Sequence, residues 1–304
     1  MVDELLTLVK RRRGPYYLAA GPAVQAGIPH PQNGAGNGPG KEEIPYRFVH
    51  YQQDGPIATV TLSRPELSNR VGLEMATELR EVCQAVQADE NIRLVILTGE
   101  GDQFSVGREV LPEDLSGSPA SVSLDWLRSI QAASAIAAIQ VPVIVAVNGD
   151  AMDHGLELAI AGDIRVASSG SKFGLTDLAA GAFPWDGGTQ RLPRLVGPAW
   201  ARDMLFTGRM VDATEALSIG LVNRVAEQPG QLGDLVKEIA EQITGGSPIG
   251  ARYAKEAAAK GMDLSLELGL GLEADLNVIL QSTSDRAEGL KSFLEKRRPK
   301  FTGS

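Results

Sequence analysis

Three stretches of the sequence combine acidic residues and glycines directly after predicted strands. They are residues 104–109 (FSVGRE), residues 148–157 (NGDAMDHGLE) and residues 172–192. In open α/β sheets, the loops at the carboxyl ends of the strands form the ligand crevice. A glycine turn that opens a helix also presents free main-chain N–H groups at the positive end of the helix dipole. These loops therefore suit an anion, or a carbonyl oxygen that becomes an oxyanion during a reaction.

The segments that must position these loops alternate between strand and helix patterns. We expect strands at 46–51, 57–62, 93–98, 143–147 and 164–168, with an Asp54-Gly55 hairpin between the first two. Helical spacing occupies 72–88, where Cys83 lies on the apolar face, and then 123–139 and 154–162. From about residue 197, helical patterns dominate at 198–206, 212–218, 231–244, 248–260, 264–281 and 284–296, with one further strand at 221–225. The pattern predicts an α/β core followed by a mostly helical region.

Composition excludes several classes of protein. The 304 residues are 43% hydrophobic and 22% charged, as in an ordinary soluble domain with a sizeable core. The net charge of −9 disfavours nucleic acid or an anionic membrane as a partner. One cysteine and three histidines leave little room for a metal site. Neither a dinucleotide fingerprint nor a P-loop occurs, and no apolar run is long enough to span a membrane. We expect a soluble, cytoplasmic protein without a metal or a separate cofactor.

The first part of the chain differs from the rest. Residues 14–40 contain no Asp, Glu, Lys or Arg and are rich in Gly and Pro, so they cannot bury enough apolar surface to fold alone. We expect residues 1–44 to form a flexible extension with one short helix at 2–12. Its role is either that of a mobile tail or that of an arm that docks on a neighbouring subunit. Residues 45–230 are then the core that carries the site, and 231–304 a helical region for oligomerisation and active-site cover.

Several motifs in order along the chain carry a resemblance to a known family. They include Arg64-Pro65-Glu66 followed by Asn69, Phe104-Ser105-Val106-Gly107, the run from Pro142 to Gly149, Gly155-Leu156-Glu157, the run from Gly187 to Arg194, and Phe293-Leu294-Glu295-Lys296-Arg297. Each string is weak alone, but the ordered set from about residue 46 to residue 301 resembles the crotonase (enoyl-CoA hydratase/isomerase) superfamily. The resemblance implies a spiral of ββα units, a C-terminal helical trimerisation region, and a homotrimer or a dimer of trimers. It also implies an acyl-CoA thioester as ligand, so that coenzyme A enters as part of the substrate.

The resemblance also assigns roles to individual residues. The main-chain N–H groups of Arg108 and His154 match the pair that holds the thioester oxygen. Glu157 and Asp177 match the two acids that move protons during hydration. Two carboxyls that share one apolar pocket do not both ionise easily, so one pKa should be raised. Asp186, in the loop with Gly187 and Gly188, is a third candidate acid.

The remaining expected site residues bind substrate. Ser105, Val106 and Gly107 belong to the first loop, and Trp185 supplies a flat apolar wall that suits a ring or a dienoyl chain. Lys296 and Phe293 match the C-terminal segment in which relatives contact CoA phosphate, often from a neighbouring subunit. Arg70 replaces a small residue beside the usual CoA channel and is a candidate for a phosphate contact.

The sequence departs from the family pattern at these positions. Asp177 is one methylene shorter than the usual glutamate, Val106 and Arg108 replace small residues, and Asp153-His154-Gly155 replaces a triple-glycine turn. Asp and His tolerate a positive φ better than most residues, so the turn can survive. The orientation of the Arg108 side chain is open, and we expect the His154 ring to face away from the substrate.

Three functions fit these residues. The leading one is an acyl-CoA hydratase that adds water to an α,β-unsaturated, enoyl- or cyclic dienoyl-, thioester. The second is an enoyl- or dienoyl-CoA isomerase, or a ring-cleaving carbon–carbon hydrolase, that uses Asp186. The third is a non-catalytic scaffold that binds acyl-CoA. The sequence does not identify the acyl group.

Overall fold

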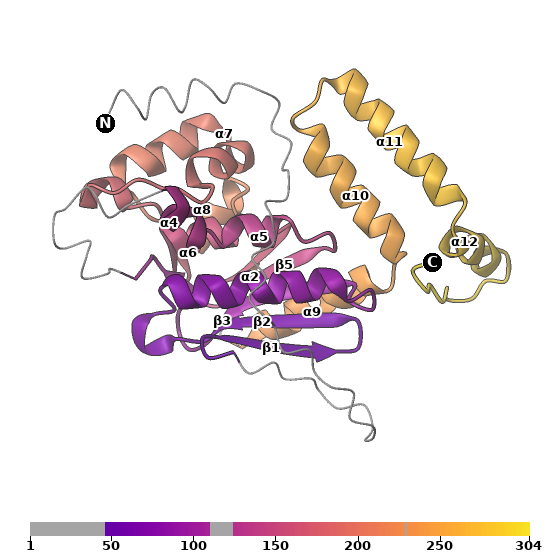
Figure 1. Ribbon diagram of the computed structural model, residues 1–304, viewed down its shortest axis with the longest axis horizontal. Coiled ribbons are helices and arrows are strands. Elements are labelled where there is room, and N and C mark those ends of the chain that lie inside the picture. The colour runs from indigo at the N-terminus through magenta and orange to yellow at the C-terminus, as the bar shows by residue number, and fades with distance from the viewer. Residues whose placement is uncertain (1–45, 110–123, 229) are drawn as a thin grey trace. The chain divides into compact units, whose positions relative to one another are not determined.

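The computed structural model describes residues 46–109, 124–228 and 230–304. The expected extension at 1–44, with its helix at 2–12, lies outside the described residues. Within them, the chain alternates strands and helices up to residue 244 and is helical afterwards (Figure 1).

Two sheets form the core. The main sheet has the order β1-β2-β3-β5-β7-β10, with strands β1(Val49–Asp54), β2(Ile57–Leu62), β3(Leu94–Gly99), β5(Val143–Val147), β7(Ile164–Ser168) and β10(Arg224–Ala226). The first two form the expected antiparallel hairpin, with Asp54 opposite Ile57, and the later strands pair in parallel. The second sheet has the order β4-β6-β8-β9, with strands β4(Ser105–Val106), β6(Ala151–Met152), β8(Lys172–Gly174) and β9(Val211–Asp212).

The two sheets show why the chain forms a spiral. Each main-sheet strand β3, β5 and β7 is followed by one short strand, β4, β6 and β8 respectively, and the short strands pair in parallel with one another. Successive turns therefore stack in register. The stacking is close, because a Cβ on Gly155 would lie 1.9 Å from the carbonyl oxygen of Ser105, one turn away.

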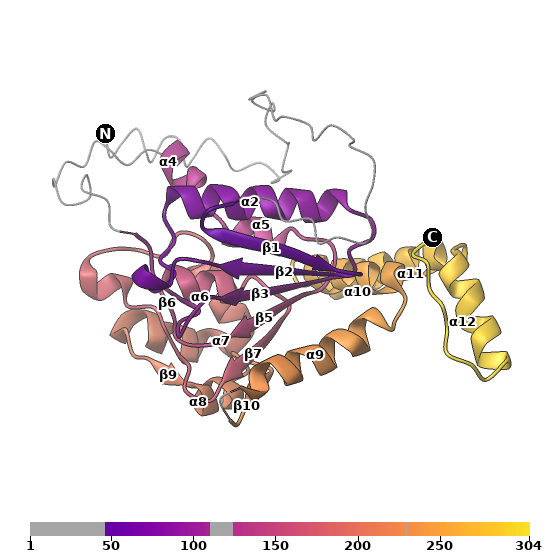
Figure 2. The ribbon, with the colours of Figure 1, turned by 90° about the horizontal axis from the view of Figure 1, so that it is seen from below.

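Helices cover both faces of the main sheet. Helix α2(Leu73–Ala88) lies on one face and α9(Gln231–Thr244) on the other (Figure 2). Successive side chains of the strands therefore point to opposite faces of the sheet. Leu94 and Ile144 pack with α9, whereas the next residues, Val95 and Val145, belong to the larger hydrophobic cluster that includes residues of α2. Cys83 is 3% exposed within α2, and burial raises the pKa of its thiol to about 12, so it is a core residue as expected.

The helices near the site are short, and the C-terminal ones are long. Their bounds are η1(Pro65–Leu67), α4(Leu124–Ser129), α5(Ala133–Ala137), α6(His154–Ala159), η2(Asp177–Ala180), α7(Gly188–Thr207), α8(Ala213–Ser218), α10(Pro248–Gly261), α11(Leu266–Gln281) and α12(Ser284–Leu294). Helix α9 packs on the sheet and therefore belongs to the core by its contacts. The expected division at residue 230 assigns it to the C-terminal helices instead. No helix in the described ranges is both long and apolar enough to cross a membrane.

Two helices differ from the expectation. The single helix expected at 123–139 is two helices, α4 and α5, because the carboxylate of Asp186 accepts the N–H groups of residues 132–134 and starts a new helix there. Helix α7 begins at Gly188, well before the expected start at 198. It contains Pro193 and Pro198 and is kinked at Gly197, where φ is 80°, and these residues hide its first turns in the sequence pattern.

Candidate active site

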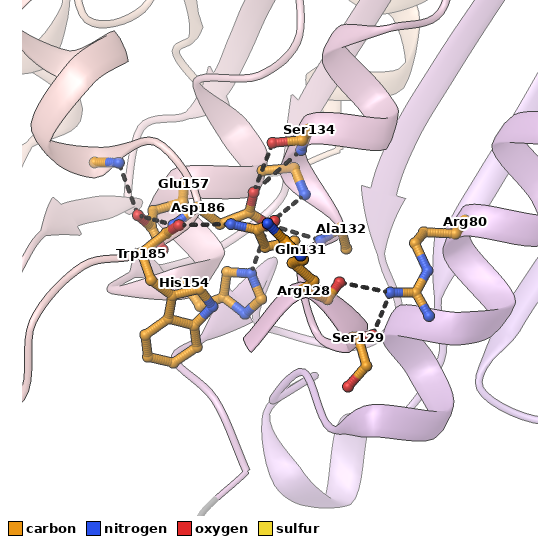
Figure 3. Close-up of polar contacts among 12 residues, drawn as sticks. Arg80, Arg128, Ser129, Gln131, Ala132, Ser134, His154, Glu157, Trp185 and Asp186 are labelled. Atoms are coloured by element: carbon orange, nitrogen blue, oxygen red, sulfur yellow. Dashed lines mark hydrogen bonds and ion pairs between the residues drawn. The ribbon is translucent and has the colours of Figure 1, made fainter. Parts of the chain in front are cut away.

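Asp186 is the centre of the polar network in the site. Its carboxylate is 2% exposed and accepts hydrogen bonds at the amino end of α5, from the N–H of Ala132 (2.6 Å), the N–H of Ala133 (2.7 Å), and the N–H and hydroxyl of Ser134 (3.2 and 3.0 Å). It also contacts Nε2 of His154 at 3.1 Å (Figure 3). Burial acts to raise the pKa of Asp186, but the hydrogen bonds and the nearby His154 ring outweigh it, so the pKa is lowered. Asp186 is therefore held as a carboxylate with its oxygens occupied.

His154 is the first residue of α6 and has two distinct groups at the site. Its main-chain N–H belongs to the first turn of a helix, where N–H groups have no partner within the helix. Its ring is 2% exposed and lies between Asp186 and Trp185, whose ring centroid is 5.4 Å away. The ring is thus turned toward Asp186 and Trp185, and its expected orientation away from the substrate stays a prediction.

Glu157 lies one helical turn further along α6 and is 1% exposed. Its Oε1 accepts hydrogen bonds from the N–H of Asp186 (2.9 Å) and from the N–H of Gly188 (2.7 Å), the first residue of α7. Burial raises the pKa of this carboxyl, and the His154 ring and the two N–H donors offset only part of the rise. Glu157 is therefore fixed in position, and its proton is held more firmly than that of an ordinary glutamate.

Asp177 begins η2 and is partly buried. Its pKa is raised to about 6, first by burial and then by the negative charges of Asp153 and Glu157, while Arg108 and His154 act in the opposite direction. The structure thus brings the two predicted acids into one electrostatic environment. Both carboxyls have raised pKa values where one was expected, and burial is the first cause for each.

The side chain of Arg108 also lies toward this environment. Its guanidinium carbon is 5.2 Å from the centroid of the Trp185 ring, and its charge lowers the pKa of Asp177. The main chain of Trp185 is held by a hydrogen bond from Gln131 Nε2 to its carbonyl oxygen at 3.0 Å. Arg108 therefore contacts Trp185 and interacts electrostatically with Asp177.

The turn that replaces the triple glycine keeps its shape because Asp153 carries the strained conformation. Its φ is 50°, and its carboxylate accepts the hydroxyl of Thr176 at 3.0 Å, which anchors it to the next turn of the spiral. Gly107, in the first loop, has φ 81°, and its N–H donates to Met152 at 2.9 Å. Ser105 is buried, and its hydroxyl donates to the carbonyl of Asn69. The neighbouring Val106 is half-buried in β4, so these three residues hold the loop in place.

Three predicted residues lie apart from this group. Arg70 is exposed beside a surface hollow lined by Glu66, Leu67, Ser68 and Glu109. Phe293 is 81% exposed near the end of α12, and Lys296 follows that helix. In the described part of the chain, no hydrogen bond or ion pair joins Phe293 or Lys296 to Glu157, Asp177 or Asp186. In the same ranges, no group of three or more His, Cys, Asp and Glu side chains is arranged to hold a metal ion.

Some residues that support the site were not predicted. The N–H groups of three residues at the start of α5 hold Asp186: Ala132, Ala133 and Ser134. Asn69 is fully buried, and its side chain makes hydrogen bonds with the main chain of Arg64, Glu100 and Gln103. Asn69 stands in a motif of the resemblance, and that was a usable signal. The pairing of Asp186 with α5 spans more than fifty residues and has no signal in one sequence.

Comparison with known proteins identifies the family. Residues 52–304 match the family described as enoyl-CoA hydratase/isomerase. The chain is 39% identical over 252 residues to (E)-benzylidenesuccinyl-CoA hydratase of Thauera aromatica, covering 82% of this chain and 96% of that protein. It is 36% identical over 262 residues to crotonyl-CoA hydratase of Syntrophomonas wolfei, covering 84% and 98%. The crystal structure of an enoyl-CoA hydratase from Bacillus anthracis superposes with a TM-score of 0.80 at 33% identity, covering 85% of this chain and all of that one. The chain is therefore an enzyme of the enoyl-CoA hydratase/isomerase family, the crotonase superfamily.

Proposed function

We propose that the protein adds water reversibly to an α,β-unsaturated acyl-CoA thioester, with Glu157 and Asp177 as the acid/base pair. The observation that carries the proposal is the pair of carboxyls with raised pKa values next to the first turn of α6. The hydratase names of the relatives support the same reaction.

The main chain supplies the electrostatic part of the mechanism. The thioester oxygen accepts hydrogen bonds from the N–H groups of Arg108 and His154, which stabilise the negative charge that develops when the β-carbon is attacked. Loss of one such donor typically costs about 3 kcal/mol in the transition state. The closely packed turn around Gly155 keeps the two loops in place.

The two carboxyls supply the proton transfers. One, as a carboxylate, takes a proton from water while the water oxygen bonds to the β-carbon, and an enolate forms. The other, as a neutral acid, delivers its proton to the α-carbon, and the enolate collapses to the hydroxyacyl thioester. A proton exchange between the carboxyls restores the starting state. The raised pKa values of both groups disfavour the doubly ionised pair, so the two carboxyls can share one proton.

The test is hydration of crotonyl-CoA, monitored by loss of the enoyl absorbance and by a product heavier by one water. We expect Glu157→Gln to lower kcat by about 10²- to 10⁴-fold. Glu74→Gln, which changes an exposed acid on α2, is the matched control and should retain the activity. Absence of turnover on any enoyl- or dienoyl-CoA, with Glu157→Gln binding thioesters like the wild type, would instead support the acyl-CoA-binding scaffold.

The alternative role of Asp186 as the acid of an isomerase or a ring hydrolase is less well supported by its contacts. Five hydrogen bonds occupy its carboxylate, and its pKa is lowered, so it is poorly suited to exchange a proton with substrate. We therefore propose that Asp186 positions His154. Product mass separates the reactions, because isomerisation adds no water. A larger loss of activity in Asp186→Asn than in Asp177→Asn, together with a ring-opened product, would favour the hydrolase.

A further inference from the structure

Two buried nitrogens of the site have no hydrogen-bond partner in the described part of the chain. They are Nδ1 of His154 and Nε1 of Trp185. The two rings lie next to each other, with centroids 5.4 Å apart and planes tilted by 48° (Figure 3). Buried polar atoms are nearly always paired in native proteins, so a pair of neighbouring unpaired nitrogens points to a missing ligand group.

Asp186 determines which nitrogen of the His154 ring donates a hydrogen bond. Its carboxylate only accepts hydrogen bonds, so the contact of 3.1 Å makes Nε2 of His154 the donor. When the ring carries only this one proton, Nδ1 presents a lone pair and accepts a hydrogen bond. The indole nitrogen of Trp185 can only donate. The two adjacent rings therefore offer one donor and one acceptor.

We propose that His154 Nδ1 and Trp185 Nε1 form a subsite for a hydroxyl group on the acyl chain of the substrate, an inference that rests on the proposed acyl-CoA function. A hydroxyl oxygen accepts from the indole N–H and donates its proton to the imidazole, so both nitrogens are satisfied. A methyl group satisfies neither nitrogen. A carboxylate only accepts, and it would add a negative charge beside Glu157, Asp177 and Asp186.

The position of the subsite indicates where the hydroxyl lies on the substrate. In the proposed mechanism, the main-chain N–H of His154 holds the thioester oxygen, and only a few bonds separate that nitrogen from Nδ1 of the same residue. The hydroxyl is therefore close to the thioester, and the carbon next to the enoyl unit is the first carbon of the acyl chain that does not itself react. A four-carbon acyl group with a terminal hydroxyl is the smallest molecule that meets this condition.

The experiment measures binding of three saturated thioesters of equal chain length to the purified full-length protein by calorimetry. Butyryl-CoA ends in a methyl group, 4-hydroxybutyryl-CoA in a hydroxyl and succinyl-CoA in a carboxylate. We expect the hydroxyl compound to bind about 10- to 100-fold more tightly than the methyl compound, because it satisfies two buried groups. Trp185→Phe keeps the apolar wall but removes the donor, and it should abolish most of this preference.

Trp200→Phe is the matched control. Trp200 also lies under an arginine, with the guanidinium carbon of Arg209 5.3 Å from its ring centroid, but it is on the outer part of α7, so the hydroxyl preference should persist. His154→Phe is a second variant that removes the acceptor and retains the main-chain N–H. The readout is a ratio of dissociation constants within one protein, so partial unfolding of a variant does not change it.

Three results would overturn the inference: equal binding of the methyl and hydroxyl compounds, tighter binding of succinyl-CoA, or an unchanged hydroxyl preference in both Trp185→Phe and His154→Phe. A different result would refute the proposed function without refuting the subsite. If the wild type prefers 4-hydroxybutyryl-CoA but hydrates neither crotonyl-CoA nor its 4-hydroxy derivative, the subsite stands and the reaction is wrong.

Discussion

The two aspartates at the site are in opposite electrostatic states, and this difference has consequences for both stability and activity. Asp177 has a raised pKa because it is partly buried near other acids, whereas Asp186 has a lowered pKa because five hydrogen bonds hold its carboxylate. A charge on Asp177 therefore opposes folding, and a charge on Asp186 favours it.

Asp177→Asn should stabilise the protein at pH 7.5 while reducing hydration. The wild-type carboxyl has a folded pKa of about 6 against an ordinary 3.8, so its ionisation costs stability above pH 6 and the cost disappears as the pH falls from 6 to 4. We expect a gain of about 1 kcal/mol, since solvent screens part of the effect. Urea unfolding at pH 7.5 and pH 4 tests this, and a gain of equal size at both values would contradict it.

Asp186→Asn should have the opposite effect. The amide cannot accept all five hydrogen bonds, and its NH₂ group faces other donors, so we expect a loss of about 3 kcal/mol at pH 7. The folded pKa lies below the ordinary 3.8, so this contribution is complete above pH 4 and declines as the pH falls further. Unfolding curves from pH 7 to pH 3 should show the difference from the wild type narrowing only at the acidic end.

At the scale of elements, the glycines at the site differ from those on the surface. A Cβ at Gly155 would lie 1.9 Å from the carbonyl of Ser105, whereas a Cβ at Gly233, within α9, meets nothing within 4 Å. Gly155→Ala should therefore push apart the two loops that contain Ser105 and Gly155. Gly233→Ala should only favour the helix.

We expect Gly155→Ala to lose most activity and to unfold at a lower temperature. Gly233→Ala should gain about 0.5–1 kcal/mol and keep its kcat. Thermal melts and crotonyl-CoA turnover of the two variants test this comparison. A fully active Gly155→Ala protein would show that the close stacking of turns does not position the loops.

The elements also show what one sequence can predict. β5(Val143–Val147) and β7(Ile164–Ser168) have the predicted bounds. In β5 this follows from a continuous run of buried apolar residues. The two-residue strands β4 and β6 were treated as loops, because so short a strand has no detectable periodicity. Glu157 and Asp177 came from ordered motifs, and the structure places them together. The orientation of the His154 ring was not predictable, since it depends on Asp186, which is far away in the sequence.

At the scale of the whole molecule, the C-terminal helices expose many apolar side chains. In α11, Leu266 is 80% exposed and Val278 71%, and Leu270 lies one turn after Leu266 with 55% exposed. Soluble monomers rarely expose contiguous apolar surface of this kind, so we expect these helices to be covered by other copies of the chain. The homotrimer, or dimer of trimers, that the resemblance implies is one such arrangement.

Assembly would also explain why no hydrogen bond or ion pair joins Phe293 or Lys296 to the other predicted site residues within the described part of one chain, because this segment would then lie against the site of a neighbouring subunit. We therefore predict that Leu266→Glu combined with Leu270→Glu yields a monomer by light scattering and raises KM for crotonyl-CoA. Leu217→Glu changes an exposed leucine on α8 and should leave both assembly and KM intact. If the variant dissociates but its KM is unchanged, substrate binding does not depend on a neighbouring subunit. Lys296 would then not bind CoA across subunits.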